Sequence, residues 1–437
     1  MSVTSSALSA RRQPPVALWA ILVLALALRL AFVLFGASAA IGGGDTPFLM
    51  LTGPALLSGQ LTGSPATGPV YLIFTGVVQW FFHGDTALLA IRLINVLIGV
   101  ALCAFSYVIG TAYAGKAVGL LTALLLAVTP VFVIEAGNVL TESVFLLFLF
   151  GALALYARWH AVPLADVPGA GWLFIGIGIL LGLATLTRAI VILLPVVLII
   201  DLLQRRRAAL RLIGALLISY VVVVGAWSVY STLRWGEFVI GAQGLAANVY
   251  LGTTTWCGPT CVDQQAGITT NSSDNQNKFM QGAFDTIRAD PLGYVRHRLA
   301  NVIDAELQPY NTVIFPGESI KAIVGDWWAQ GHPLSALGQI TQSDNFWPKL
   351  ALYLFHYLAL IGGVIGLLLS LRRLGWWLLL FGVIGYFLTV HSVLMAIPRY
   401  LLPLEPLWLL FTAYTLIWLW KRLRRVRAPS VVMEERE

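Results

Sequence analysis

The sequence has little charge, and this shortage narrows the kind of protein it can encode. Only 11% of its 437 residues are charged and 58% are hydrophobic, whereas a soluble domain carries about 25% charged residues. The net charge of +7 is spread over short basic clusters beside apolar runs and is not gathered on one soluble domain. We therefore exclude an ordinary soluble protein and expect no nucleic acid partner.

Cysteine is also scarce, with three residues in the whole chain. Cys103 lies inside an apolar run, where a free cysteine usually serves as a small packing residue. Cys257 and Cys261 flank Gly-Pro-Thr in a polar segment with no histidine nearby, and zinc sites usually need four ligands. We predict a short-loop disulfide between these two cysteines in an oxidising compartment, and we expect neither a metal site nor a cofactor.

Long apolar runs take the place of the missing charge. The run from 16 to 39 contains one charge, Arg29, and about 20 such residues suffice to cross the hydrocarbon core of a bilayer. This run is too long for a signal peptide and lacks a small-residue cleavage site, so we expect a retained first helix. The sequence predicts an all-α membrane protein with many crossings. The further expected spans are residues 86–111, 117–134, 139–158, 211–231, 346–371, 375–396 and 401–420.

Residues 171–200 decide the number of crossings. One straight helix of this length would extend about 45 Å, more than the core thickness. The basic clusters at 158–160 and 205–207 can both be cytoplasmic only if the segment goes out and returns near Arg188. This gives about ten crossings with both termini cytoplasmic. In the rival topology, residues 69–83 cross and 171–200 is one tilted span, but about 15 residues favour an interfacial helix.

One polar segment, residues 232–345, divides the chain and is expected to form a loop domain at the outer face. Residues 1–231 form an N-terminal transmembrane region whose first outer loop is 40–68. Residues 346–437 form the C-terminal helices and a basic cytoplasmic tail. Two helices are expected within the polar segment, at residues 274–290 and 291–307, the second beginning at a proline.

Polar residues gather at the outer ends of the expected helices. They are Asp45, Arg92, Asn95, Glu135, Asn138, Glu142, Arg188, His391, Arg399, Tyr400 and Glu405. Glu135, Asn138 and Glu142 follow one another at i, i+3 and i+7, which predicts one stripe at a helix start. A transporter would tend to place such groups near the midplane, whereas an enzyme acting at the outer interface would place them at this level. Alternatively, pairs of the Arg92–Glu142 kind only hold helices together.

Asp45 is distinguished by its neighbours in the sequence. Three glycines, residues 42–44, precede it and allow the backbone to approach a ligand closely. The same pattern, followed by Thr46 and Pro47, is also typical of a plain helix start. A carboxylate at such a place can act as a general base, and an arginine at the same level can bind a phosphate through two parallel N–H groups.

Six short motifs occur in a fixed order over most of the chain. They are Asp45 after the first helix, Arg92-Leu93-Ile94-Asn95, Thr141-Glu142-Ser143, Gly182-Leu183-Ala184-Thr185-Leu186-Thr187-Arg188, Asn248-Val249-Tyr250-Leu251-Gly252 and Arg399-Tyr400-Leu401-Leu402-Pro403. Together they resemble the C-type glycosyltransferase fold, in the branch of protein O-mannosyltransferases and bacterial aminoarabinose and related sugar transferases. Two places depart from that pattern. Thr46 stands where several branches have a second acid, which argues against a paired-carboxylate metal site, and Glu405 lies between two prolines where an apolar residue is expected.

The resemblance implies an inverting glycosyltransferase of the plasma membrane. It would move a sugar from a polyprenyl or dolichyl phosphate to a glycan, lipid or protein acceptor at the outer face. Asp45 would take the proton of the acceptor hydroxyl, and Arg188 and Arg399 would bind the donor phosphate and stabilise it as it leaves. The supporting residues would be Glu142, Arg92, Tyr400 and Asn138. A lipid or sugar-lipid transporter and a polymerase or ligase of surface polysaccharide remain as alternatives.

Overall fold

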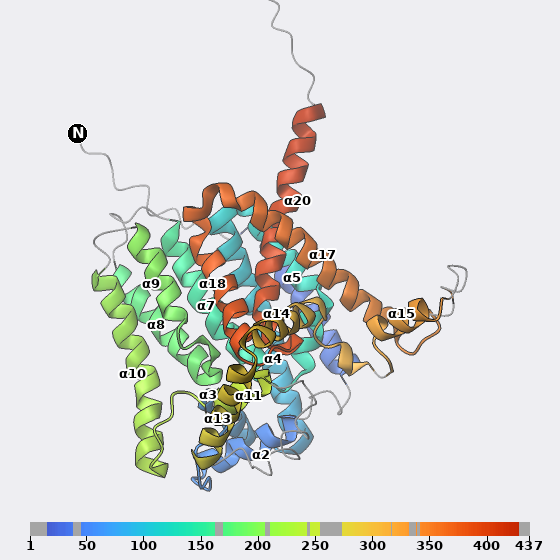
Figure 1. Ribbon diagram of the computed structural model, residues 1–437. Coiled ribbons are helices and arrows are strands. Elements are labelled where there is room, and N and C mark those ends of the chain that lie inside the picture. Colours follow the sequence, from blue (N-terminus) through green and yellow to red (C-terminus); the bar gives the residue numbers. More distant parts are fainter. Residues whose placement is uncertain are drawn as a thin grey trace, which may run out of the picture.

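The computed structural model describes residues 15–37, 45–161, 169–205, 210–242, 245–253, 273–315, 317–331, 338 and 341–427. This part of the chain is built from helices and contains no strand (Figure 1). The longer helices are α1 (Val16–Ala31), α4 (Gly84–Ala114), α5 (Lys116–Val128), α7 (Glu142–His160), α8 (Ala170–Thr187), α10 (Leu210–Trp235), α17 (Phe346–Ser370), α18 (Leu374–Val393) and α20 (Glu405–Arg427). They form the all-α membrane region that the apolar runs predict.

Shorter helices connect and cover these. In the N-terminal half they are the π-helix η2 (Phe32–Gly36), α2 (Asp45–Leu57), α3 (Pro69–Phe81), α6 (Pro130–Ile134), the 3-10 helices η3 (Glu135–Gly137) and η5 (Ala189–Val191), and α9 (Leu194–Arg205). Towards the C-terminus they are α11 (Leu245–Thr253), α13 (Ser273–Ala289), α14 (Pro291–Leu307), η6 (Thr312–Ile314), α15 (Ile320–Ala329), η8 (Leu371–Arg373), α19 (Pro398–Leu401) and η9 (Leu402–Leu404).

The described residues contain seven helical stretches long and apolar enough to cross a membrane, with α17 and α18 counted together as Phe346–Val393, or eight if the bent pair Lys116–Val128 and Pro130–Gly137 is one span. The chain is therefore an integral membrane protein with several passes. The ten crossings expected from the sequence exceed this count. One reason is that α9, which would have to make the expected return crossing after Arg188, has 12 residues and extends only about 18 Å at 1.5 Å per residue, less than the hydrocarbon core.

The expected boundaries agree with the structure except where the chain bends. Residues 171–200 do break at Arg188, which has extended backbone between α8 and η5. The helices expected at 274–290 and 291–307 are α13 and α14. The helix expected at 117–134 is instead bent by 60° at Thr129 and Pro130, because proline disfavours the helical conformation of the residue before it.

Close packing of small residues brings the long helices together. A Cβ atom on Gly178 of α8 would lie 2.3 Å from the Leu216 carbonyl of α10, and one on Gly366 of α17 would lie 2.1 Å from the Phe411 carbonyl of α20. Glycine lets two backbones approach where apolar side chains give no extra drive for association in lipid. Helix α7 packs against both α4 and α8, and most of its residues are buried. Its first residue, Glu142, is also buried.

The two ends of the bundle differ in composition. In Figure 1, α17 and α18 meet at the basic turn Arg372–Arg373, and α20 runs to its basic C-terminal residues, both at the top of the view. Helices α2 and α3 lie at the bottom. The segment 232–345 contacts the bundle through Arg298 of α14, whose guanidinium donates to the His391 carbonyl oxygen of α18 at 2.8 Å and to the Gly252 carbonyl oxygen of the same segment at 2.7 Å.

Candidate active site

The centre of the site is Glu142, the first residue of α7. Its side chain is buried, with the residue 1% exposed, and its carboxylate accepts hydrogen bonds from two arginines. Arg188 donates through Nη1 and Arg399 through Nε to Oε1, and Arg399 Nη2 lies 3.2 Å from Oε2. Residues from the middle and the end of the chain therefore meet on one carboxylate.

Asp45 completes the group as its exposed member. It is the first residue of α2, and its Oδ2 accepts from Arg399 Nη1 at 2.5 Å while 57% of the side chain remains exposed. The glycines at 42–44 lie outside the described residues. An exposed carboxylate beside buried charges is the group that an incoming hydroxyl can reach.

Arg188 owes its position to the end of α8. Its extended backbone follows the last turn of that helix, and its side chain is 15% exposed. A Cβ atom on Gly68 would lie 2.3 and 2.4 Å from the carbonyl oxygens of Leu186 and Thr187, so only glycine lets the first loop pack against this turn. The guanidinium lies 4.7 Å from the ring centroid of Tyr400, an arrangement in which the ring face attracts a cation.

Arg188 and Arg399 differ in the number of N–H donors that remain unused. All three nitrogens of Arg399 donate to Asp45 or Glu142. Among the described residues, Arg188 uses only Nη1, so its Nε and Nη2 are available to another acceptor. A guanidinium can present two parallel donors to a phosphate, and this free edge suits that task.

A second set of residues supports the 135–142 backbone. Arg92 Nε donates to the Gly137 carbonyl at 2.9 Å, and Asn95 Nδ2 donates to the Asn138 carbonyl at 2.7 Å. Both residues come from α4 and are buried. They therefore fix the backbone that leads into Glu142.

The expected stripe of Glu135, Asn138 and Glu142 is wrong. Glu135 belongs to η3, Asn138 has extended backbone, and only Glu142 starts a regular helix. The helical spacing is lost because the chain bends after α5. Asn138 nevertheless lies near Glu135, to which its Nδ2 donates at 2.7 Å.

Two residues of the segment 232–345 also lie beside Asn138, and sequence reasoning missed them. Asn138 Nδ2 lies 3.0 Å from Asn311 Oδ1 and 3.4 Å from the Tyr310 hydroxyl. Burial raises the pKa of Tyr310 well above its ordinary value, so the phenol keeps its proton. The local signal was only Asn311 in the left-handed conformation, with φ of 69°, which a sequence does not display.

The remaining expected residues are more scattered. Tyr400 stacks on His391 with ring centroids 5.8 Å apart. Glu405 is not in the group and instead pairs with His356, 3.1 Å between Oε2 and Nδ1. Cys257 and Cys261 lie outside the described residues, so their disulfide stays a prediction, and Cys103 is a buried free thiol.

The four charged side chains around Glu142 balance one another. Asp45 and Glu142 supply two negative charges, and Arg188 and Arg399 two positive ones. We call these four residues the charge cluster. Within the described residues, no three His, Cys, Asp or Glu side chains lie close enough to hold a metal ion. The free N–H donors of Arg188 in the charge cluster suit an anion, and the exposed carboxylate of Asp45 can take a proton.

Part of the chain, including several residues of this site, matches a known protein family. Residues 64–231 match the family model described as dolichyl-phosphate-mannose-protein mannosyltransferase. This is less than half of the chain, yet it contains Arg92, Asn138, Glu142 and Arg188. No curated protein sequence matches the chain at a significant level.

Solved structures of similar shape include two membrane enzymes. The Archaeoglobus fulgidus oligosaccharyltransferase, tethered with an acceptor peptide, has a TM-score of 0.49 and 14% identity, over 96% of this chain and 51% of its own. ArnT from Cupriavidus metallidurans, bound to undecaprenyl phosphate, has a TM-score of 0.44 and 16% identity, over 91% and 78%. The chain thus spans about half the length of the archaeal enzyme, and at these identities the likeness concerns the fold alone. The resemblance to the C-type glycosyltransferases, in the branch with protein O-mannosyltransferases, is confirmed by the family match over residues 64–231.

Proposed function

We propose that the chain is a membrane glycosyltransferase that takes its sugar from a polyprenyl or dolichyl phosphate. The observation that carries the proposal is the charge cluster, in which an exposed carboxylate and an arginine with free donors lie at one end of the bundle. The family description, which names a dolichyl-phosphate sugar, supports the same donor class. The acceptor is a hydroxyl-bearing glycan, lipid or protein.

The reaction assigns one role to each charged residue. Asp45 takes the proton of the acceptor hydroxyl as its oxygen attacks the anomeric carbon. The new bond forms on the side opposite the phosphate, the bond from that carbon to the phosphate oxygen breaks, and the sugar inverts. Glu142 stays buried and holds Arg188 and Arg399 at a fixed spacing, so the guanidinium groups are oriented before the donor arrives.

Charge explains why arginine serves in place of a general acid. A sugar phosphodiester carries one negative charge, and the departing lipid phosphate gains a second one as the bond breaks. Prepositioned donors act most strongly where charge develops in the transition state. The free Nε and Nη2 of Arg188 therefore contribute to donor binding and contribute more to the rate.

We place the charge cluster at the outer face of the plasma membrane and both termini in the cytoplasm. The support is the basic turn at Arg372–Arg373 and the basic end of α20, both at the opposite end of the bundle from α2 (Figure 1), since basic residues concentrate on cytoplasmic loops. Residues 232–345 then form the outer loop domain between the membrane regions 1–231 and 346–437.

Purified protein in detergent can test the proposal directly. It is incubated with a panel of polyprenyl-phosphate sugars and a mixture of glycan, lipid and peptide acceptors, and the lipid products are analysed by mass spectrometry. We expect free polyprenyl phosphate to accumulate with one donor, and Asp45→Asn to abolish the accumulation. If intact donors are only carried across vesicle membranes and no bond is cleaved by the wild type, the protein is a transporter and the proposal is wrong.

A further inference from the structure

The end of α14 is held by three side chains from one face of α17. His356 Nε2 lies 2.7 Å from the Glu306 carbonyl oxygen, and the Tyr357 hydroxyl donates to the Leu307 carbonyl at 3.0 Å. One turn earlier, the Tyr353 hydroxyl donates to Gln308 Oε1 at 3.0 Å. The last carbonyls of a helix have no partner within it, and here α17 supplies the partners.

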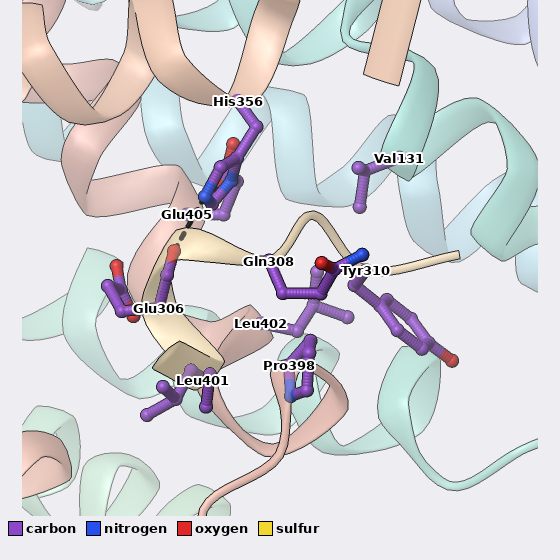
Figure 2. Close-up of a pocket in the computed structure, with 10 residues that line it drawn as sticks. Val131, Glu306, Gln308, Tyr310, His356, Pro398, Leu401, Leu402 and Glu405 are labelled. Carbon is purple, nitrogen blue, oxygen red and sulfur yellow. Dashed lines mark hydrogen bonds and ion pairs between the residues drawn. The ribbon is translucent and has the colours of Figure 1, made fainter. Parts of the chain in front are cut away.

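The first turn of α20 closes the same contact from the other side. Glu405 Oε2 lies 3.1 Å from His356 Nδ1, and Trp408 Nε1 donates to Glu306 Oε1 at 2.5 Å. We call Glu306, His356, Glu405 and Trp408 the α14 latch. Its members come from α14, α17 and α20, which are far apart in the sequence. Figure 2 shows His356, Glu405 and Glu306 together beside a small cavity, with Tyr310 on the opposite side.

The hydrogen-bond pattern requires a proton in the His356–Glu405 contact. A carbonyl oxygen only accepts, so Nε2 must carry a hydrogen to bond with Glu306. Nδ1 faces a carboxyl group, so a proton must lie on either Nδ1 or Glu405. If that proton left, two acceptors would face each other in a buried place, because both residues are 6% exposed, and a buried unpaired polar group is costly.

The latch is linked to the charge cluster by two short pieces of chain. Arg399 lies six residues before Glu405, and the segment 398–404 that contains it contributes Pro398, Leu401 and Leu402 to the cavity wall. On the other side, Tyr310 and Asn311 follow four and five residues after Glu306. Both segments line or border the same cavity, so a shift of α14 relative to α20 moves Arg399 relative to Asn138.

The carboxyl group of Glu306 is a member of the latch that is both buried and close to a second carboxyl group. Burial, and then the negative charge of Glu405, raise its pKa to about 8. His356 on α17 and Glu405 on α20 are the titratable groups that act on it. Two further helices packed on α14 carry titratable groups with partners of their own: Arg399 of α19 binds Glu142, and the His391 ring of α18 stacks on Tyr400.

We infer that the α14 latch positions Arg399 for the transfer reaction. Ionisation of Glu306 opens the latch, so that activity is lost at alkaline pH. This inference rests on the proposed function. Neutral Glu306 accepts from Trp408 without repelling Glu405. Ionised Glu306 places a second negative charge beside Glu405 and opens the contact between α14 and α20.

The pH profile of turnover tests this positioning role. In wild-type protein, turnover falls about tenfold between pH 7 and pH 9, as one ionisation near pH 8 requires. Glu306→Gln still accepts from Trp408 but has no charge, and we expect it to keep most of its turnover at pH 9. The matched control is Asp304→Asn, which removes an exposed carboxylate from the same helix and should follow the wild-type profile. Identical profiles for wild type and Glu306→Gln would overturn the inference.

Thermal unfolding in detergent separates this inference from the proposed function. The pKa of Glu306 is higher in the folded state, about 8 against 4.5, so the folded protein holds this proton more tightly. Wild-type stability therefore decreases as the pH rises from about 4.5 to about 8. Glu306→Gln should lack this decrease and gain on the wild type over the same range, even if no donor is turned over. Parallel melting curves at every pH would remove the latch, whatever the activity.

Discussion

Arginine is used in two ways in this molecule, and the comparison shows what makes one of them suited to function. Arg29 is fully buried in α1, and its guanidinium donates to the carbonyl oxygens of Leu126 and Ala127 at 3.1 and 3.2 Å. Arg188 and Arg399 bind carboxylates and keep 15% and 22% of their side chains exposed. Arg29 is bound to backbone carbonyl oxygens inside the bundle. Arg188 and Arg399 are bound to side-chain carboxylates and remain partly exposed.

The surroundings of Arg29 explain why its hydrogen bonds are structural. Leu126 and Ala127 are among the last residues of α5, where the carbonyls lack helical partners and carry partial negative charge. A Cβ atom on Gly99 would lie 2.4 Å from Arg29 Nε, so α4 leaves room for this one side chain. Arg188, in contrast, keeps one edge of its guanidinium free, with Nε and Nη2 not used among the described residues.

Asp45→Asn should give the largest effect, because it removes the proton acceptor together with one negative charge of the charge cluster. The amide keeps the size and much of the hydrogen bonding, yet it takes no proton at neutral pH, so turnover should fall about 100- to 10,000-fold. Turnover is normalised to folded protein, and Asp85→Asn, an exposed acid at the start of α4, serves as the control. Near wild-type turnover of Asp45→Asn would show that Asp45 is a helix-capping residue, and the mechanism would be lost.

Arg188→Ala should come next and act on binding as well as on rate. Loss of one donor to a developing negative charge lowers kcat about 100-fold, and KM for the lipid donor should rise because the phosphate is charged before the reaction. Arg188→Lys keeps the charge without the two parallel donors and should lie between. Steady-state kinetics with varied donor measure both constants. Equal values for wild type and Arg188→Ala would show that this arginine only packs against Tyr400.

Arg29→Met should show the reverse pattern. It preserves most of the volume but leaves the carbonyls of Leu126 and Ala127 without donors, a loss of about 2–3 kcal/mol. We expect a lower melting temperature in detergent with turnover per folded molecule unchanged. A fall in turnover without a change in melting temperature would place Arg29 on the functional side of the comparison.

The smallest perturbation is a label that tests which end faces outward. In a background without Cys103, Cys257 and Cys261, single cysteines are placed at the exposed positions Thr62 and Arg373. An impermeant maleimide should label position 62 on intact cells and position 373 only after lysis, with activity retained. The opposite pattern would move the charge cluster to the cytoplasmic face.

Much of the helical framework could be predicted from the sequence, because apolar length and helix breakers are local properties. The break at Arg188 followed from a run too long for one crossing, and the short helix α3 from a run too short. The bend after α5 was missed, although Pro130 marks it, because the apolar run continues through it. The ten crossings were too many because the chain after Arg188 was counted as a return crossing, although α9 has only 12 residues.

The members of the charge cluster were predictable and their arrangement was not. Asp45, Glu142, Arg188 and Arg399 were singled out by depth and by resemblance. That Glu142 binds both arginines could not be deduced, since the contact with Arg399 joins residues 257 positions apart. Tyr310 and Asn311 lie in a polar segment with no apolar pattern, and Glu405 gained an explanation only when His356 was found beside it.

The contact between Asp45 and Arg399 joins residues 354 positions apart, which sets an order of assembly during synthesis. At about 5–20 residues per second, Arg399 leaves the ribosome roughly 20 to 70 s after Asp45. Arg188 follows Glu142 by only 46 positions, so this pair can form while later helices are still being made. The second guanidinium joins last, and a nascent chain that stops before α19 has inserted holds an incomplete site, with Asp45 still lacking its partner.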